Sequence, residues 1–82
     1  MQKIRPDLNL GQNIRKLRVQ NNLTQDETIG KMQLMGLNIS RSTYAKLETN
    51  LMNIKVSELI ALKNIFNCSF DDFFKDLILP EE

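Results

Sequence analysis

Helix-start signals, each followed by apolar residues at helical spacing, constrain the fold of this chain most. Four residues have side-chain oxygens that can accept free backbone N–H groups at a helix N-terminus: Asn9, Thr24, Ser40 and Ser69. Glu27 and Asp72 complete capping boxes with two of them. Together with the apolar spacing from Val56 to Phe66, these signals predict five short helices, at about 9–21, 24–36, 40–49, 56–66 and from 69 onward. No strand is indicated, so the fold class is all-α, a compact five-helix bundle.

Length and composition fit one small domain. The 82 residues are 41% hydrophobic, which is enough for a small core, and 26% charged, which is within the globular range. We expect the domain to span residues 9–79, with an N-terminal arm at 1–8 and a tail at 80–82. The arm carries Lys3 and Arg5, which either touch nucleic acid or lie on a frayed terminus.

The residues that catalysis and metal binding usually need are scarce. The chain has no histidine, and its one cysteine, Cys68, lies in an apolar run and is expected to be a buried thiol. There is no Gly-rich phosphate loop and no nucleophile motif, and the acidic residues at 71, 72 and 76 suit a helix dipole. We therefore expect no enzyme activity, no cofactor, no metal and no small-molecule substrate. No apolar run is long enough to cross a membrane, so a cytoplasmic location is expected.

The formal net charge of +1 combines a basic half with an acidic half. Residues 1–50 hold eight Lys and Arg against four Asp and Glu, whereas residues 51–82 hold three against six. Such asymmetry suggests one face suited to a polyanion. Helix 40–49 has an apolar side with Tyr44 and Leu47, which Leu51 would continue, and an opposite polar side. That polar side either meets an anionic groove or is an ordinary solvated helix face; it carries Arg41, Ser42, Ala45, Lys46 and Thr49.

Two positions in helix 24–36 call for an explanation. Gln25 would project from the helix N-terminus, where unpaired N–H groups and the helix dipole favour a phosphate oxygen. Gly30 weakens the helix interior, and close packing against another helix is the preferred explanation for it.

Several short motifs, each weak alone, are more specific together. They are Leu17-Arg18, Leu23-Thr24-Gln25, Ile39-Ser40-Arg41-Ser42-Thr43 and Lys46-Leu47-Glu48. In this combination the chain resembles the Cro/repressor-type helix-turn-helix family, also called the xenobiotic-response-element family. The resemblance covers about Leu10 to Phe74 and implies a lambda-repressor-like bundle with a helix-turn-helix motif at about 24–49.

The resemblance implies DNA-binding roles for eight residues: Gln25, Ser40, Arg41, Ser42, Thr43, Lys46, Asn50 and Asn53. Gln25 would contact the DNA backbone and outer bases. Arg41, Ser42 and Lys46 would reach base edges, although Lys46 could instead neutralise phosphate. Ser40 and Thr43 would flank them at phosphates, and Asn50 and Asn53 would donate to the DNA backbone from the next loop.

Three further implications concern the scaffold. Arg18 and Glu48 would form a buried ion pair between the first helix and the recognition helix. Tyr44 stands at a usually aliphatic position, so its ring should be buried with its hydroxyl reaching a partner. Segment 33–38 is about five residues longer than the family pattern, so the second helix should be a turn longer or the turn itself wider.

Three further positions, all apolar, depart from the family pattern. Leu51 and Met52 stand in a loop that is usually basic, and they should pack inward or against a partner. Ile29 stands where alanine is preferred, at the crossing of the two helices.

The sequence thus predicts a sequence-specific, repressor-like regulator that binds double-stranded DNA as a homodimer, with helix 40–49 in the major groove. The dimer surface would come from the fifth helix and tail. The alternative role of this segment is intramolecular core, which is preferred for Phe70 and Phe73. The candidates for the dimer surface are Phe70, Phe74, Leu77, Ile78 and Leu79. The alternative function is a protein-interaction or antitoxin-like module on the same scaffold, which the weak net charge and Leu51-Met52 favour.

Overall fold

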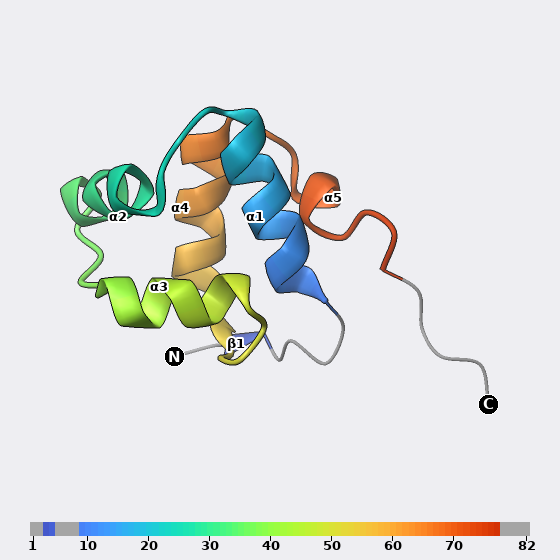
Figure 1. Cartoon of the computed structure of the whole chain (residues 1–82), viewed down its shortest axis with the longest axis horizontal. Helices are drawn as coiled ribbons and strands as arrows, with labels where there is room; N and C mark the ends of the chain where they lie inside the picture. The colour runs from blue at the N-terminus through green and yellow to red at the C-terminus, as the bar shows by residue number, and fades with distance from the viewer. Residues whose placement is uncertain (1–2, 5–8, 78–82) are drawn as a thin grey trace.

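Five helices and two very short strands form the computed structural model, which describes residues 3–4 and 9–77. The helices are α1 (Leu10–Gln20), α2 (Gln25–Leu34), α3 (Arg41–Glu48), α4 (Val56–Phe66) and the single-turn α5 (Phe70–Phe73). Figure 1 shows α3 along one edge of the molecule, next to α2 and the start of α1, both of which it contacts. The predicted all-α bundle is confirmed.

The helices begin where the sequence predicts, because local hydrogen bonds satisfy their first N–H groups. Thr24 accepts the N–H of Glu27 at 3.1 Å, and the Glu27 carboxylate accepts the N–H of Thr24 at 2.9 Å, which completes the capping box. Ser40 accepts the N–H of Thr43 at 3.1 Å. Contacts of the same kinds begin α1 and α5.

Helix ends depend on residues that tolerate a left-handed backbone. Asn22, Asn50 and Asn67 have φ values of 57°, 64° and 50°, and Gly36 has a φ of 90°. Asparagine adopts this conformation more readily than most other non-glycine residues, so it suits the end of a helix. The first four helices therefore end within one or two residues of their predicted stops.

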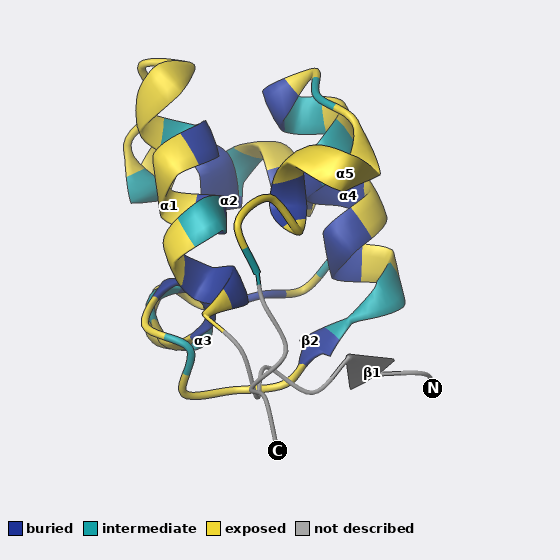
Figure 2. Ribbon diagram, turned by 90° about the vertical axis from the view of Figure 1, so that its right-hand side faces the viewer, coloured by how far each residue is buried: buried dark blue, intermediate teal, exposed yellow. Residues whose placement is uncertain are grey.

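The core is formed by one face of each helix. Tyr44, Phe73 and Leu62 are fully buried, and they come from α3, α5 and α4. The predicted stripe of α1 is also buried and consists of Leu10, Ile14 and Leu17. Figure 2 shows the buried residues of the helices turned toward the interior. The core thus holds α3 by one side and leaves the other side accessible.

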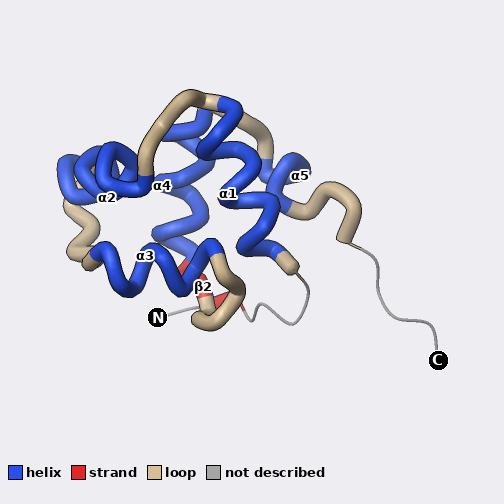
Figure 3. The backbone as a smooth tube through the Cα atoms, viewed as in Figure 1, coloured by secondary structure: helices blue, strands red, loops and turns tan. Residues whose placement is uncertain are grey.

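The extra length before α3 lies in the turn and not in an added turn of helix. Helix α2 ends at Leu34, and residues 35–40 lead to α3 (Figure 3). The chain reverses at Gly36, where the N–H of Leu37 donates to the carbonyl of Met32 at 3.1 Å. Ile39 is buried and returns the chain to the core just before the Ser40 cap.

Strand pairing was not predicted. Strand β1 (Lys3–Ile4) pairs antiparallel with β2 (Ile54–Lys55), with Ile4 opposite Ile54 and Lys3 opposite Lys55. Lys3 was expected in an N-terminal arm and no strand was expected, because two residues are too few to show alternation. The partners are also far apart in the chain.

The role predicted for Gly30 is wrong. A methyl group at position 30 would have nothing within 4 Å, whereas one at Gly11 would collide with the carbonyl oxygen of Leu47 and lie 2.7 Å from that of Glu48. The close helix approach therefore falls on Gly11, where α1 meets the C-terminal end of α3.

A second correction concerns Cys68, which was expected to be buried and is half-buried. Its partial burial raises the pKa of its thiol.

Candidate nucleic-acid interface

Helix α3 presents two unlike faces. Tyr44, Leu47 and Glu48 are buried against the core. On the other side Arg41, Ser42 and Lys46 are exposed, and the small Ala45 is half-buried between them. An exposed helix with long cations around a small centre has the dimensions and charge to enter a DNA major groove.

The first turn of α3 is held by its own side chains. The Ser40 hydroxyl donates to the hydroxyl of Thr43 at 3.0 Å while it accepts the N–H of the same residue. Ser40 and Thr43, both predicted near phosphates, thus fix the geometry of the helix start. At the other end, the Thr49 hydroxyl folds back onto the carbonyl oxygen of Ala45 at 3.0 Å.

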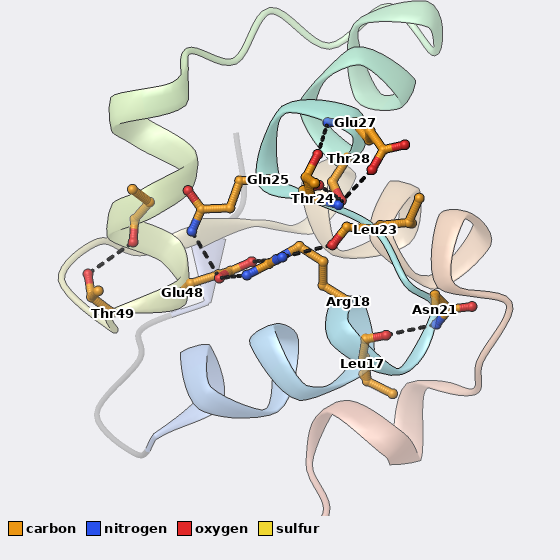
Figure 4. Close-up of polar contacts among 11 residues, drawn as sticks. Leu17, Arg18, Asn21, Leu23, Thr24, Gln25, Glu27, Thr28, Glu48 and Thr49 are labelled. Atoms are coloured by element: carbon orange, nitrogen blue, oxygen red, sulfur yellow. Dashed lines mark hydrogen bonds and ion pairs between the residues drawn. The ribbon is translucent and has the colours of Figure 1, made fainter.

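Arg18 and Glu48 form a two-pronged ion pair between α1 and α3. The Nε of Arg18 lies 2.6 Å from Oε2 of Glu48, and its Nη2 lies 3.1 Å from Oε1. The two side chains are 11% and 2% exposed. Arg18 also donates from Nη1 to the carbonyl oxygen of Leu23 at 2.8 Å, so its guanidinium joins three segments (Figure 4).

Gln25 joins the same cluster from α2. Its Nε2 donates to Oε1 of Glu48 at 3.1 Å, which links the first residue of α2 to the last residue of α3. Burial alone would raise the pKa of the Glu48 carboxyl, but its hydrogen-bond donors, Arg18 above all, hold that pKa below its ordinary value. Gln25 is therefore oriented by a carboxylate before any ligand is present.

The Tyr44 hydroxyl does not reach the partner expected for it. The side chain is fully buried, but the hydroxyl makes no hydrogen bond of acceptable geometry with the residues that the structure describes. Glu48, Arg18 and Thr28 are its polar neighbours. Burial, followed by the nearby Glu48 carboxylate, raises the pKa of Tyr44 far above its ordinary value.

Arg41 has one ionic partner, and that partner comes from α2. Its Nε lies 3.5 Å from Oδ1 of Asp26, and both side chains are largely exposed, at 70% and 68%. Arg41 makes no other hydrogen bond or ion pair with the described part of the chain. The contact between Arg41 and Asp26 was not predicted, because it joins two helices across the turn.

The loop after α3 departs from the expectation for its apolar residues. Leu51 is 74% exposed and Met52 lies at the surface, so inward packing is wrong for both. Asn50 accepts the N–H of Gly11 on its Oδ1 at 3.1 Å, which ties the loop to the start of α1. Asn53 is exposed in the same loop.

The described residues contain no group of metal-binding side chains. None of the helices in residues 9–77 is long and apolar enough to cross a membrane. Ile78 and Leu79, two of the predicted dimer residues, lie outside the described residues.

A helix pair joined by a turn, with the second helix exposed along a polar face, defines a helix-turn-helix domain. Comparison with protein families agrees, because the family model described as helix-turn-helix, of the Cro/C1 type, matches residues 14–73. The chain therefore belongs to this family of DNA-binding domains. A comparison with curated proteins gives no match.

Proposed function

We propose that this chain is a sequence-specific transcriptional regulator that binds double-stranded DNA through the outer face of α3. The observation that carries the proposal is the exposure of Arg41, Ser42 and Lys46 on a helix whose other face is buried. An arginine at this place can donate two parallel hydrogen bonds to guanine, and a lysine can neutralise phosphate. Such a regulator would act in the cytoplasm, where it represses or activates transcription.

The same proposal includes a homodimer. One small helix-turn-helix domain makes few contacts, and two-fold dimers read paired half-sites. Phe70, for which a core position was expected, is exposed on α5, and Phe74 is exposed beside it, so both supply apolar surface for such an interface. Leu77 packs against the core. Phe73, by contrast, is fully buried and belongs to the core.

The test is selection of bound sequences from a random duplex pool, followed by affinity measurements on the selected site and on random duplex. We expect an enriched, two-fold symmetric sequence and an affinity that falls steeply with salt, because phosphate contacts release counterions. Absence of binding to any duplex at micromolar protein and low salt would refute the proposal.

A second candidate function is a protein-interaction module on the same scaffold. The observation that favours it is Leu51, a large apolar side chain exposed in a loop of a DNA-binding motif. This alternative predicts no DNA binding and a partner contact that Leu51→Ser abolishes.

A further inference from the structure

Asp26 and Arg41 are placed so that one controls what the other can contact. Asp26 lies in the first turn of α2, and Arg41 is the first residue of α3. The carboxylate approaches the guanidinium at Nε, 3.5 Å away. Because a guanidinium has donors on two edges, a partner at Nε leaves the edge with Nη1 and Nη2 available.

The carboxylate of Asp26 is available for this contact, whereas its neighbour is not. Glu27, the other acidic residue of the first turn of α2, is occupied by the capping box with Thr24. Gln25, on the other side of Asp26, is bound to Glu48. Asp26 is therefore the one acidic side chain of this turn that is directed to the recognition helix.

Because of its position in α3, Arg41 needs an ionic partner to hold its side chain in one orientation. A cation at a helix N-terminus gains nothing from the helix dipole, so the dipole does not hold the side chain in place. A long, exposed arginine can also turn toward the nearest phosphate, which carries no sequence information. A carboxylate at Nε restrains this movement and repels phosphate oxygens from the same space.

From this geometry we propose that Asp26 is a positioning residue for specificity, which keeps the Arg41 guanidinium on bases and away from phosphates. The proposal rests on DNA binding by α3. It predicts that Asp26 weakens binding to random DNA while it increases discrimination between the selected site and random DNA. An acidic residue beside the interface thus acts on specificity through Arg41.

The experiment compares affinities for the selected site and for random duplex, measured by fluorescence anisotropy at one fixed salt concentration. For Asp26→Asn we expect tighter binding to random duplex and a specificity ratio that is lower by about two- to fivefold, the scale of an exposed ion pair. Asp26→Glu keeps the negative charge, so it should retain most of the wild-type specificity ratio. Asp76→Asn, which removes an equal charge from an exposed site after α5, controls for net charge and should leave the ratio unchanged.

A double-mutant cycle tests whether Asp26 acts through Arg41. In an Arg41→Ala background, Asp26→Asn should lower the specificity ratio no further, because the residue to be positioned is gone. A further drop in that background, or equal effects of Asp26→Asn and Asp76→Asn in the wild-type background, would overturn the inference and leave the proposed function intact. Failure of the wild-type protein to bind any duplex would overturn both.

Discussion

Gln25 donates a hydrogen bond from its side-chain amide to the Glu48 carboxylate at 3.1 Å, and so joins the start of α2 to the end of α3. Arg18 binds the same carboxylate from α1. The buried Glu48 carboxylate of α3 is thus bound by side chains from both α1 and α2. These contacts fix the relative positions of the three helices, and those positions decide how the motif meets DNA.

Glu48→Ala should lower the free energy of unfolding by about 3–5 kcal/mol, because it leaves the Arg18 guanidinium in a largely buried site without its partner. Urea unfolding followed by circular dichroism measures the change. Asp26→Ala is the matched control, since it breaks an exposed ion pair that also joins two helices, and its effect should be small. Equal effects of the two substitutions would show that burial of the Arg18–Glu48 pair contributes nothing.

Acid should destabilise the protein partly through Glu48. The pKa of this carboxyl is lowered in the folded state, so the unfolded chain binds more protons as the pH falls through the ordinary value of 4.5. The stability it contributes is complete above that pH and is lost as the pH falls through the lowered value. Glu48→Gln should therefore show a shallower decline in the free energy of unfolding between about pH 5 and pH 3.

The decline should not vanish in Glu48→Gln. The backbone N–H and hydroxyl of Thr24 also lower the pKa of Glu27, which contributes to the same acid range. Parallel curves for the wild-type protein and Glu48→Gln would contradict the assignment to Glu48.

Two glycine-to-alanine substitutions should change the stability of the protein in opposite directions. Gly11→Ala forces a methyl group against the backbone carbonyls of Leu47 and Glu48, which cannot move aside without shifting α3. Gly30→Ala meets nothing within 4 Å and should stabilise α2 by up to about 1 kcal/mol through helix propensity. Melting temperatures of the two variants measure the difference. A stabilised Gly11→Ala protein would mean that α1 and α3 are not in contact there.

Tyr44→Phe should leave stability unchanged or raise it slightly. The hydroxyl is buried and makes no hydrogen bond of acceptable geometry with the described residues, so its removal relieves a desolvation cost and leaves no partner unpaired. Tyr44→Ala, which removes the ring, should cost about 3–5 kcal/mol and shows that the site is sensitive to packing. A loss of more than about 1 kcal/mol in Tyr44→Phe would indicate that the hydroxyl does bind Glu48 or Thr28.

Alanine substitutions of Arg41 and Lys46 should distinguish base reading from phosphate binding. Arg41→Ala should weaken binding to the selected site by about 1–3 kcal/mol and affect random duplex much less. Lys46→Ala should weaken both and reduce the salt slope by about one. Titrations at several salt concentrations measure both effects. Equal losses on both duplexes for Arg41→Ala would remove its base-reading role.

Local features of the fold could be predicted from the sequence, whereas contacts between distant segments could not. Thr24 with Glu27 and Ser40 with Thr43 follow from residues three apart, and the structure contains both caps. The pairing of β1 with β2 joins segments some fifty residues apart and involves only two residues on each side, too few for a pattern.

The two glycines illustrate the same limit. Gly30 interrupts a helix in the sequence and so attracts attention, yet it faces open space. Gly11 stands beside a cap, where glycine is unremarkable, and only the crossing of α1 and α3 reveals its role. The contact between Asp26 and Arg41 escaped prediction for the same reason, since it depends on where the turn delivers α3.

The wide turn at 35–40 has a consequence for how such domains vary. Both helices are held by contacts outside this connection: Gln25, at the start of α2, and Arg18 bind Glu48 at the end of α3, and Met32 of α2 and Tyr44 of α3 are buried in the core. Lengthening a connection whose ends are already fixed costs little, because closure entropy grows only with the logarithm of length. The turn should therefore accept an inserted tag or fluorophore, or be shortened. Either change should leave the recognition helix in place relative to the rest of the domain.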